Sequence, residues 1–423
     1  MTARAAAREV LGIPEYRAVW AGQALSVIGD QLARIALAVL VYDRTRSPLA
    51  TAVAYAGSYL PWLAGGLVLA AAADRWPRRA VLVACDAARG TLVAVMAVPG
   101  MPLAVMVALL YAVTLLDGPY YAARAGLYAD ILPRDQYPTG IAAAATTGQA
   151  ALVIGFAAGG ILAGAAGPRP ALAIDAATFG LSALLIRFAV AARPAAAGPA
   201  APMAARVTAG VRLVFADRRL RTCMLFGWLA ALYTVPAALA VPLAAALGGG
   251  PAAAGLLVAA GPLGTAAGTA AYGRRVSAPR IGPLAALCCA ILALFAARPG
   301  LAWSLAVIAA SGTLACYQVA ANTGFMQALR RDQQAAAFGV AASGIWTAQG
   351  LAYLAAGAAA EVLPPAVVIA VFGIAGAAAG AALTAASRPR GTAGRAAALP
   401  GGGRAGRCCQ QEERAGRGDG GAG

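Results

Sequence analysis

The sequence contains no histidine and no lysine, so all 33 of its basic residues are arginine. Without lysine the chain has no G-x-x-x-x-G-K-[ST] loop, which excludes ATP-driven transport by a P-loop within this chain. Without histidine, a side chain that exchanges protons near neutral pH has to be an aspartate or glutamate in an environment that favours its neutral form. The seven cysteines show neither C-x-x-C nor Cys/His spacing. We therefore expect no metal and no cofactor.

Charged residues of any kind are scarce. They make up 12% of the chain, against 61% for hydrophobic residues, whereas soluble domains carry about 25% charged residues. Twelve apolar runs can be drawn between residues 18 and 386, each near the roughly 20 residues that a helix needs to cross a bilayer. The runs are rich in glycine and alanine, which let helices approach closely in lipid. The sequence predicts an all-α membrane protein with twelve transmembrane helices.

The order of the runs predicts four parts. Residues 1–192 form an N-terminal six-helix bundle, 193–221 a cytoplasmic linker, 222–386 a C-terminal six-helix bundle, and 387–423 a disordered cytoplasmic tail. The tail is rich in glycine and arginine and shows no apolar periodicity, which favours disorder. An internal repeat supports the two halves, because Arg134-Asp135-Gln136 aligns with Arg331-Asp332-Gln333 in the equivalent loop.

The arginines are distributed unequally between the two sides of the membrane. With the N-terminus in the cytoplasm, 26 of them fall in cytoplasmic segments and four outside. Cytoplasmic loops collect positive residues. We therefore expect a multi-pass protein of the plasma membrane (an inner membrane in a cell that has two), with both termini cytoplasmic. This distribution also accounts for the net charge of +17 without a nucleic-acid partner.

Several short motifs resemble those of the major facilitator superfamily. The loop after the second run, with Asp74-Arg75 and Arg78-Arg79 following Gly65-Gly66, is similar to the loop between its helices 2 and 3. Gly155, Gly159 and Gly160 resemble its fifth-helix antiporter motif, with Phe156 in place of the usual proline. The resemblance implies the major facilitator fold, two pseudo-symmetric six-helix bundles that handle a substrate between them.

Further stretches resemble the branch of enterobactin exporters and macrolide-efflux-like transporters. They are Tyr16–Trp20, Ser26–Asp30, Thr45–Pro48 and Ile174–Phe179. The resemblance to this branch implies export.

Charged residues inside the apolar runs are costly and are therefore candidates for function. Asp30 lies near the middle of the first run, and Arg34 follows one helical turn later. Two interpretations are open: a neutral structural ion pair, or a carboxylate that binds protons or a substrate cation. Asp175 is a further proton-coupling candidate, although its place near the outer end of the sixth run would allow simple hydration.

A second group of charges predicts a conformational latch. Asp86 and Arg89 are expected to lie shallow in the third run, close to the cytoplasm, and Asp117 in the cytoplasmic half of the fourth. A substrate site is the alternative for these charges. We expect them to pair with the loop charges Asp74, Arg75, Arg78 and Arg79.

The second half has no carboxylate within an apolar run. Its candidates for the substrate cavity are uncharged polar and aromatic residues: Gln318, Asn322, Trp346, Gln349 and Tyr353. Tryptophan and tyrosine are also ordinary anchors at the membrane surface, which is the alternative interpretation.

Together these features predict a secondary active transporter, proton-coupled, that exports a small amphipathic molecule such as a drug, a macrolide-like metabolite or a siderophore by alternating access. A proton-coupled uptake permease is the alternative. A membrane-embedded enzyme is disfavoured because no nucleophile–base pair or repeated carboxylate pair is found. The expected partners are the small-molecule substrate, protons and the lipid bilayer, and we expect a monomer.

The arginine distribution yields a direct test of topology. Reporter domains fused after Arg79 and after Arg275 should both read as cytoplasmic. A periplasmic signal at either position would contradict the predicted orientation.

Overall fold

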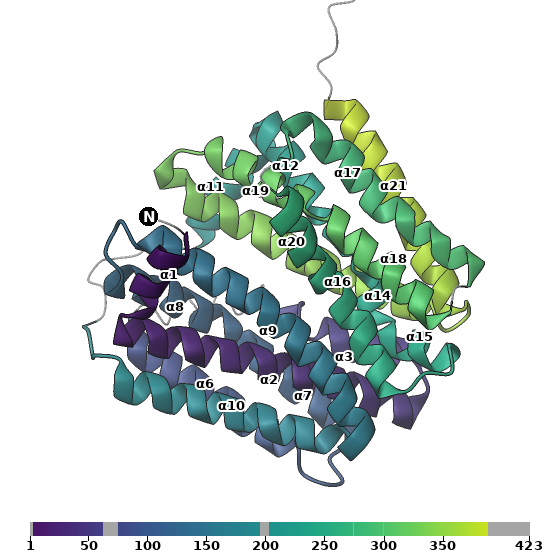
Figure 1. Ribbon diagram of the computed structural model, residues 1–423, viewed down its shortest axis with the longest axis horizontal. Coiled ribbons are helices and arrows are strands. Elements are labelled where there is room, and N and C mark those ends of the chain that lie inside the picture. Colours follow the sequence, from purple (N-terminus) through teal and green to yellow (C-terminus); the bar gives the residue numbers. More distant parts are fainter. Residues whose placement is uncertain (1–2, 62–74, 195–202, 274, 299, 388–423) are drawn as a thin grey trace, which may run out of the picture. The chain divides into compact units, whose positions relative to one another are not determined.

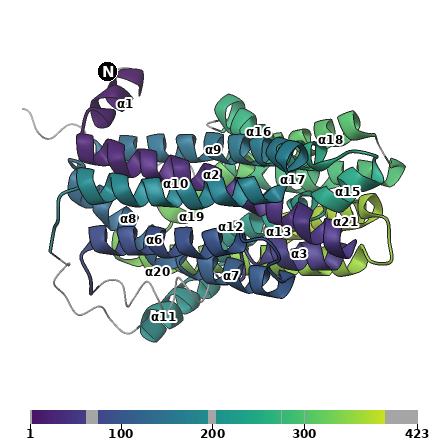
Figure 2. The same ribbon diagram turned by 90° about the horizontal axis from the view of Figure 1, so that it is seen from below.

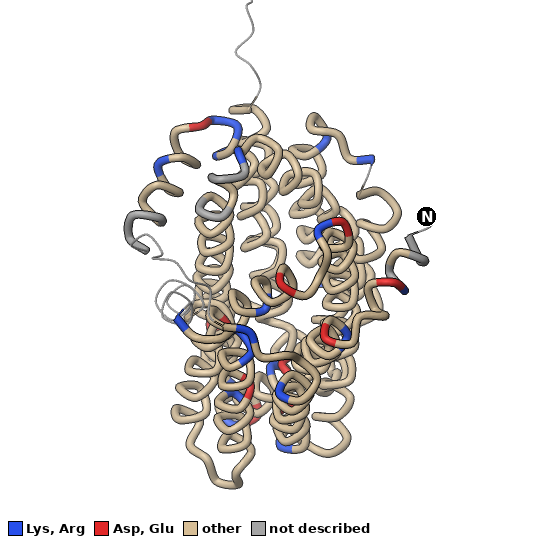
Figure 3. Tube along the Cα trace, turned by 90° about the vertical axis from the view of Figure 1, so that its left-hand side faces the viewer, with Lys and Arg blue, Asp and Glu red and all other residues tan. Residues whose placement is uncertain are grey.

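The computed structural model describes residues 3–61, 75–194, 203–273, 275–298 and 300–387. Within these ranges every regular element is a helix, which confirms the predicted all-α class. The chain up to Ala386 forms one compact unit. Charged positions are few along its trace (Figure 3).

The N-terminal bundle contains the helices that occupy the lower part of Figure 1. They are α1 (Ala3–Leu11), α2 (Pro14–Thr45), α3 (Pro48–Ala56), α6 (Arg78–Met96), α7 (Leu103–Leu115), α8 (Asp117–Ile131), α9 (Tyr137–Ala166) and α10 (Pro168–Ala189). Several begin with proline in the first turn, where the missing N–H costs no hydrogen bond. Helices α2, α9 and α10 run beside one another (Figure 2).

The C-terminal bundle follows a connecting helix, α11 (Met203–Ala216). Its elements are α12 (Arg218–Trp228), α13 (Ala230–Tyr233), α14 (Val235–Ala238), α15 (Ala240–Ala246), α16 (Pro251–Tyr272), α17 (Ala278–Ala290), η2 (Ile291–Ala297), α18 (Leu301–Leu314), α19 (Tyr317–Gln327), α20 (Arg331–Ala359) and α21 (Pro365–Ser387). Single residues separate α12 from α13, α13 from α14 and α14 from α15, and i→i−4 hydrogen bonds continue past them, so this first span of the bundle is one helix interrupted only by single turn residues.

Nine segments in the described part of the chain are long and apolar enough to cross a membrane. Helix α20, with 29 residues, and helix α6, with 19, are also long enough, but α6 carries Arg78, Arg79, Asp86 and Arg89. Helix α3 begins a further segment, and residues 62–74 lie outside the described part. These twelve segments fit the predicted two bundles of six.

The two bundles touch mainly through two pairs of helices, α9 with α16 and α3 with α20. In the first pair, a Cβ atom built on Gly160 would lie 2.6 Å from the Pro251 carbonyl oxygen and 2.7 Å from the Gly255 Cα. In the second pair, a Cβ on Gly357 would lie 3.1 Å from the Leu49 Cα. Only glycine permits backbones to approach this closely.

Both contacts lie at the same end of the bundles. They use the C-terminal parts of α9 and α20 and the N-terminal parts of α16 and α3. In the predicted topology this is the outer end, and we call it the closed end. Ile35, Tyr55, Leu257 and Tyr353, two residues from each bundle, belong to the buried apolar cluster that extends across the contact.

The close backbone contact at Gly160 predicts the effect of a side chain there. Gly160→Val would overlap Pro251 and Gly255, and overpacking of this kind costs about 1–3 kcal/mol, so the closed end should open at least about fivefold more often. Spin labels at Arg169→Cys and Arg298→Cys, one on each bundle at this end, would report the separation as a distance distribution. Gly164→Val is the matched control, because the nearest atom to a Cβ there is 3.8 Å away. Equal effects at both positions would contradict the interpretation.

Candidate functional site

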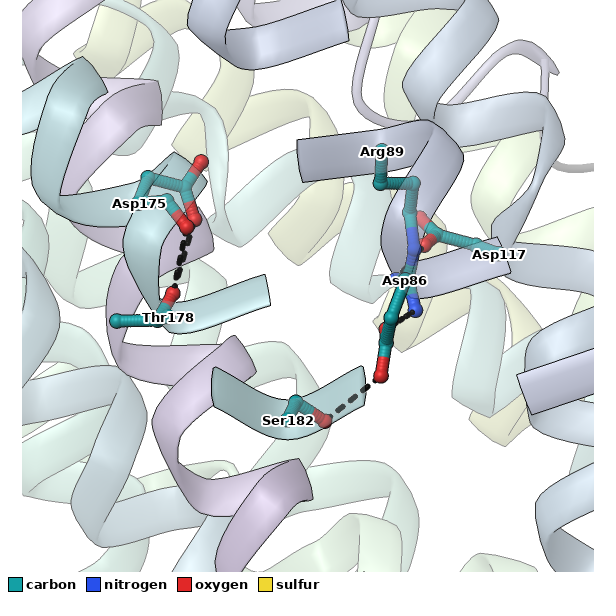
Figure 4. Close-up of polar contacts among 6 residues, drawn as sticks. All are labelled: Asp86, Arg89, Asp117, Asp175, Thr178 and Ser182. Carbon is teal, nitrogen blue, oxygen red and sulfur yellow. Dashed lines mark hydrogen bonds and ion pairs between the residues drawn. The ribbon is translucent and has the colours of Figure 1, made fainter. Parts of the chain in front are cut away.

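A buried guanidinium group organises the charged residues of the N-terminal bundle. Arg89 on α6 donates to the Asp86 carboxylate at 2.6 Å and to the Asp117 carboxylate on α8 at 2.9 Å. Its guanidinium carbon also lies 4.1 Å from the centre of the Tyr120 ring and 4.7 Å from that of Phe179. Figure 4 shows Arg89 between the two carboxylates.

This ion-pair cluster extends to α10 through a hydroxyl group. Ser182 donates to the second Asp86 oxygen at 2.7 Å, and Asp86 and Arg89 are 0% and 1% exposed. Removing two charges from water costs several kcal/mol per ion, and this cost is repaid only where each charge finds close partners. One guanidinium group thus binds α6 directly to α8 and, through Asp86 and Ser182, to α10.

The depth of these residues corrects the prediction. Asp86 and Arg89 are the ninth and twelfth residues of the 19 in α6, and Asp117 lies near the middle of the span Leu103–Ile131. The cluster therefore lies near the middle of these helices rather than at one end. The apolar run drawn at residues 80–99 begins two residues after the helix does and extends three residues past its end, so position within the run understates the depth of Asp86 in the helix.

Asp175 on α10 also lies deeper in the protein than predicted. It is 1% exposed, so it is not hydrated at the surface, and the Thr178 hydroxyl donates to its backbone carbonyl at 2.7 Å. A Cβ built on Gly29 would touch both Thr178 and Asp175. Glycine at that position therefore brings Asp175 next to the turn of α2 that carries Asp30.

Asp30 and Arg34 do not form the ion pair that their spacing allows. Among the described residues neither has an ion-pair partner within 4 Å. Instead the Arg34 guanidinium lies 5.5 Å from the centre of the Tyr59 ring, and its buried Nε has no hydrogen-bond partner. The interpretation as a neutral structural pair is wrong for this conformation.

The loop charges form a group separate from the cluster. Arg78 pairs with Asp130 at 2.5 Å and donates to the Gly126 carbonyl, and Arg79 donates to the Val190 carbonyl at 2.8 Å. Arg75 is exposed, and Asp74, like Gly65 and Gly66, lies outside the described residues. Among the described residues the latch charges therefore form two networks, and Arg78 and Arg79 bond to groups other than Asp117.

The antiporter-like glycines allow α9 to pack closely against its neighbours. Gly155 and Gly159 face α2 near Ile28 and Leu32, whereas Gly160 faces α16. Phe156, in place of the motif's proline, is buried at 4% exposure, and α9 runs unbroken through it. The motif here provides close contacts and no kink.

In the C-terminal bundle, three of the five cavity candidates bond to the interrupted span α12–α15. Gln349 and Tyr353 on α20 donate to the Thr234 hydroxyl at 3.2 and 3.0 Å, and Gln318 on α19 donates to the Tyr233 hydroxyl at 2.7 Å. Thr234 and Tyr233 were not predicted, although Pro236 and Pro242 in the same apolar run indicated an irregular helix.

The remaining two candidates are Trp346 and Asn322. Trp346 packs against Tyr59 of the other bundle, with ring centres 5.3 Å apart, and Tyr59 in turn packs against Tyr353 at 5.1 Å. Asn322 is exposed one turn further along α19, and no contact joins it to the others. Arg34, Tyr59, Trp346 and Tyr353 thus meet between the bundles, a group that pairwise spacing in the sequence cannot reveal.

Comparison with known proteins identifies the family. The model of the Major Facilitator Superfamily matches residues 19–352. The chain belongs to the major facilitator superfamily. This shows a membrane transporter rather than an enzyme, as predicted, and no curated sequence matches the chain.

Solved transporter structures share the fold at low sequence identity. A bacterial homolog of the human lysosomal transporter Spinster, inward-facing and occupied, has TM-score 0.64 and 16% identity over 88% of this chain and 93% of that one. The nucleoside transporter NupG has TM-score 0.68 and 11% identity over 88% and 98%. A POT family transporter in complex with 5-aminolevulinic acid has TM-score 0.68 and 10% identity over 88% and 94%. These likenesses show the major facilitator fold and leave the branch as a prediction.

The ion-pair cluster predicts the cost of losing its cation. Arg89→Leu leaves Asp86 and Asp117 buried without a countercharge, which should destabilise the transporter by about 3–5 kcal/mol. The measurement is thermal unfolding of the purified protein together with its yield in the membrane. Arg89→Leu combined with Asp117→Asn should recover part of the loss. Arg124→Leu is the control, since Arg124 stacks on the exposed ring of Tyr121, and an equal loss there would contradict the prediction.

Proposed function

We propose that this transporter is a proton-coupled secondary exporter of a small amphipathic molecule such as a drug, a macrolide-like metabolite or a siderophore. The observation that carries the proposal is the pair Asp30 and Arg34, one turn apart on α2 and each without an ionic partner among the described residues. Unpaired charges inside a membrane bundle are costly and are kept where they act on substrate or ions.

The balance of charge around Asp30 favours proton coupling. Four carboxyl groups (Asp30, Asp86, Asp117 and Asp175) share the middle of the bundle with the guanidinium groups of Arg34 and Arg89, and Arg124 lies two turns along α8 from Asp117. Arg89 already serves Asp86 and Asp117. Asp30 and Asp175 therefore have no dedicated cation, and a bound proton on either would reduce the excess negative charge.

A proton carrier needs a carboxyl group whose surroundings differ between the two conformations, and in this proposal Arg34 changes the surroundings of Asp30. In this conformation its guanidinium group lies over Tyr59 and away from Asp30. When the bundles rock and Tyr59 separates from Trp346 and Tyr353, Arg34 is free to move toward Asp30 and to displace the proton. The carboxyl group then alternates between a desolvated environment and one beside a cation, which changes its proton affinity.

The substrate contacts are divided between the bundles in this proposal. Arg34 and Tyr59 offer a cation and a ring on one side, and Trp346, Gln349 and Tyr353 offer rings and an amide on the other. Such a surface suits a molecule that combines an apolar ring system with hydrogen-bonding groups. Export rather than uptake is proposed on the resemblance to the exporter branch.

The proposal also covers the domains, the topology, the oligomeric state and the latch. Residues 1–192 and 222–386 move as two bodies joined by the linker 193–221, with both termini cytoplasmic and the protein a monomer in the plasma membrane. The closed end then faces outward. The loop charges Asp74, Arg75, Arg78 and Arg79 remain the proposed latch on the cytoplasmic side, and in this conformation Arg78 and Arg79 bond within the N-terminal bundle.

Asp30 provides the test of coupling. Asp30→Asn should abolish uphill transport driven by an imposed pH gradient in proteoliposomes, by at least about tenfold, while substrate binding to the purified protein is kept. Arg34→Ala should change the pH dependence of transport, since it removes the cation that alternates.

Asp135→Asn, in an exposed loop, is the matched carboxylate control for this test. If the Asp30→Asn variant still transports substrate against its concentration gradient, the proton carrier is another residue, and Asp175 is the next one to examine. The direction of movement in the same vesicles separates export from uptake.

A further inference from the structure

Glu361, in the turn between α20 and α21, is bonded to the other bundle. Its Oε1 accepts a hydrogen bond from the Ser47 hydroxyl at 2.5 Å and one from the Leu49 backbone N–H at 2.8 Å. Both donors belong to the N-terminus of α3, more than 300 positions away in the sequence. None of the functions assigned above uses this residue.

These bonds complete the cap of α3. The first turn of a helix leaves N–H groups without partners inside the helix. Here Pro48 has no N–H, the Ala50 N–H bonds to the Ser47 hydroxyl at 3.0 Å, and the Leu49 N–H bonds to Glu361. A helix of one bundle thus takes part of its cap from a carboxylate of the other, at the positive end of its dipole.

The contact lies at the closed end, beside the close approach of Gly357 to Leu49. When the bundles separate at this end, Glu361 must leave α3, and the Leu49 N–H must find water instead. The hydrogen bonds therefore exist in one of the two conformations of an alternating transporter, and they favour that conformation.

No other charge accounts for the position of Glu361. Helix α3 and the start of α21 carry no charged residue, and the rest of the turn carries none. The nearest charged groups along the chain, at the end of α2, have other contacts: Arg44 donates to the Met101 carbonyl, and Arg46 lies over the Tyr42 ring. Asp43 is exposed, and no ion pair joins Glu361 to any described residue.

We propose that Glu361 is a positioning residue of the transport cycle, whose carboxylate caps α3 across the two bundles and holds their outer ends together. The proposal rests on the alternating motion proposed above. It adds a gate residue at the outer surface, separate from the proton-coupling residues in the middle of the membrane.

The contact predicts the sign of a pH effect. Hydrogen bonds from Ser47 and Leu49 lower the pKa of Glu361 from its ordinary value, which is about 4.3. Stabilisation of the closed end is therefore complete at neutral pH, where the carboxylate is ionised both in the closed and in the open conformation. It is lost as the outer pH falls below the ordinary value and through the lowered one.

The test measures distances in the full chain with its native cysteines replaced, in lipid nanodiscs at pH 7. One pair of spin labels, at Arg169→Cys and Arg298→Cys, reports the outer end, and a second, at Arg134→Cys and Arg275→Cys, reports the opposite end. Glu361→Ala should raise the long-distance population of the outer pair about two- to fivefold, the effect of a charge at a helix N-terminus. The opposite pair should move closer together.

Glu361→Gln keeps an acceptor and should show an intermediate effect, which guards against a fold defect in the alanine variant. Asp43→Asn, a carboxylate of the same surface, is the control and should leave both distances unchanged. Between pH 7 and pH 3.5 the outer pair should shift toward longer distances in the native chain but not in Glu361→Gln.

Several results would overturn the proposal. They are unchanged outer distances in Glu361→Ala, an equal shift in Asp43→Asn, a shift of the outer pair without the opposite pair, and an acid response that survives Glu361→Gln. Each of these can occur in a protein that still transports through Asp30. Failure of this gate residue is therefore distinguishable from failure of the proposed coupling.

Discussion

The pairing of Arg89 with Asp86 and Asp117 is the interaction on which the N-terminal bundle depends. A single guanidinium group satisfies two carboxylates in a region where water cannot, and the aromatic faces of Tyr120 and Phe179 enclose it. Ser182 extends the network to α10. Because the cost of an unpaired charge at this depth is several kcal/mol, these helices are held in one relative arrangement. That arrangement fixes the surroundings in which Asp30 and Asp175 lie.

The two bundles share a fold but carry different kinds of polar side chain. The N-terminal bundle carries the charges of the membrane interior, whereas the C-terminal bundle offers hydroxyl, amide and indole groups around the interrupted span α12–α15. An interrupted helix exposes backbone groups that need partners. Thr234 lies in this span, and its hydroxyl accepts hydrogen bonds from both Gln349 and Tyr353. This asymmetry is consistent with ion coupling in one bundle and substrate contacts in both.

Glycine determines where the bundles can meet. Gly160 and Gly255 allow α9 and α16 to touch through their backbones, and Gly357 does the same for α20 against α3. Large apolar side chains such as Ile35, Tyr55, Leu257 and Tyr353 pack around these close backbone contacts. Glu361 adds hydrogen bonds from Ser47 and Leu49 of the other bundle to this contact. These bonds favour the conformation in which this end is closed.

The sequence alone determined the class, the span pattern and the family, because long apolar runs and loop motifs are local features that survive without knowledge of packing. It also placed Asp30, Arg34 and Asp175 among the candidates, since a charge in an apolar run is visible in one dimension. Tertiary structure decided which charges meet. Arg78 bonds to Asp130 rather than to Asp117, Asp30 and Arg34 stay apart despite their spacing, and Thr234 and Glu361 gain partners far along the chain. These outcomes depend on how each helix is rotated and how deep it lies. A shift of a few residues in a helix end changes both, and apolar composition does not encode either.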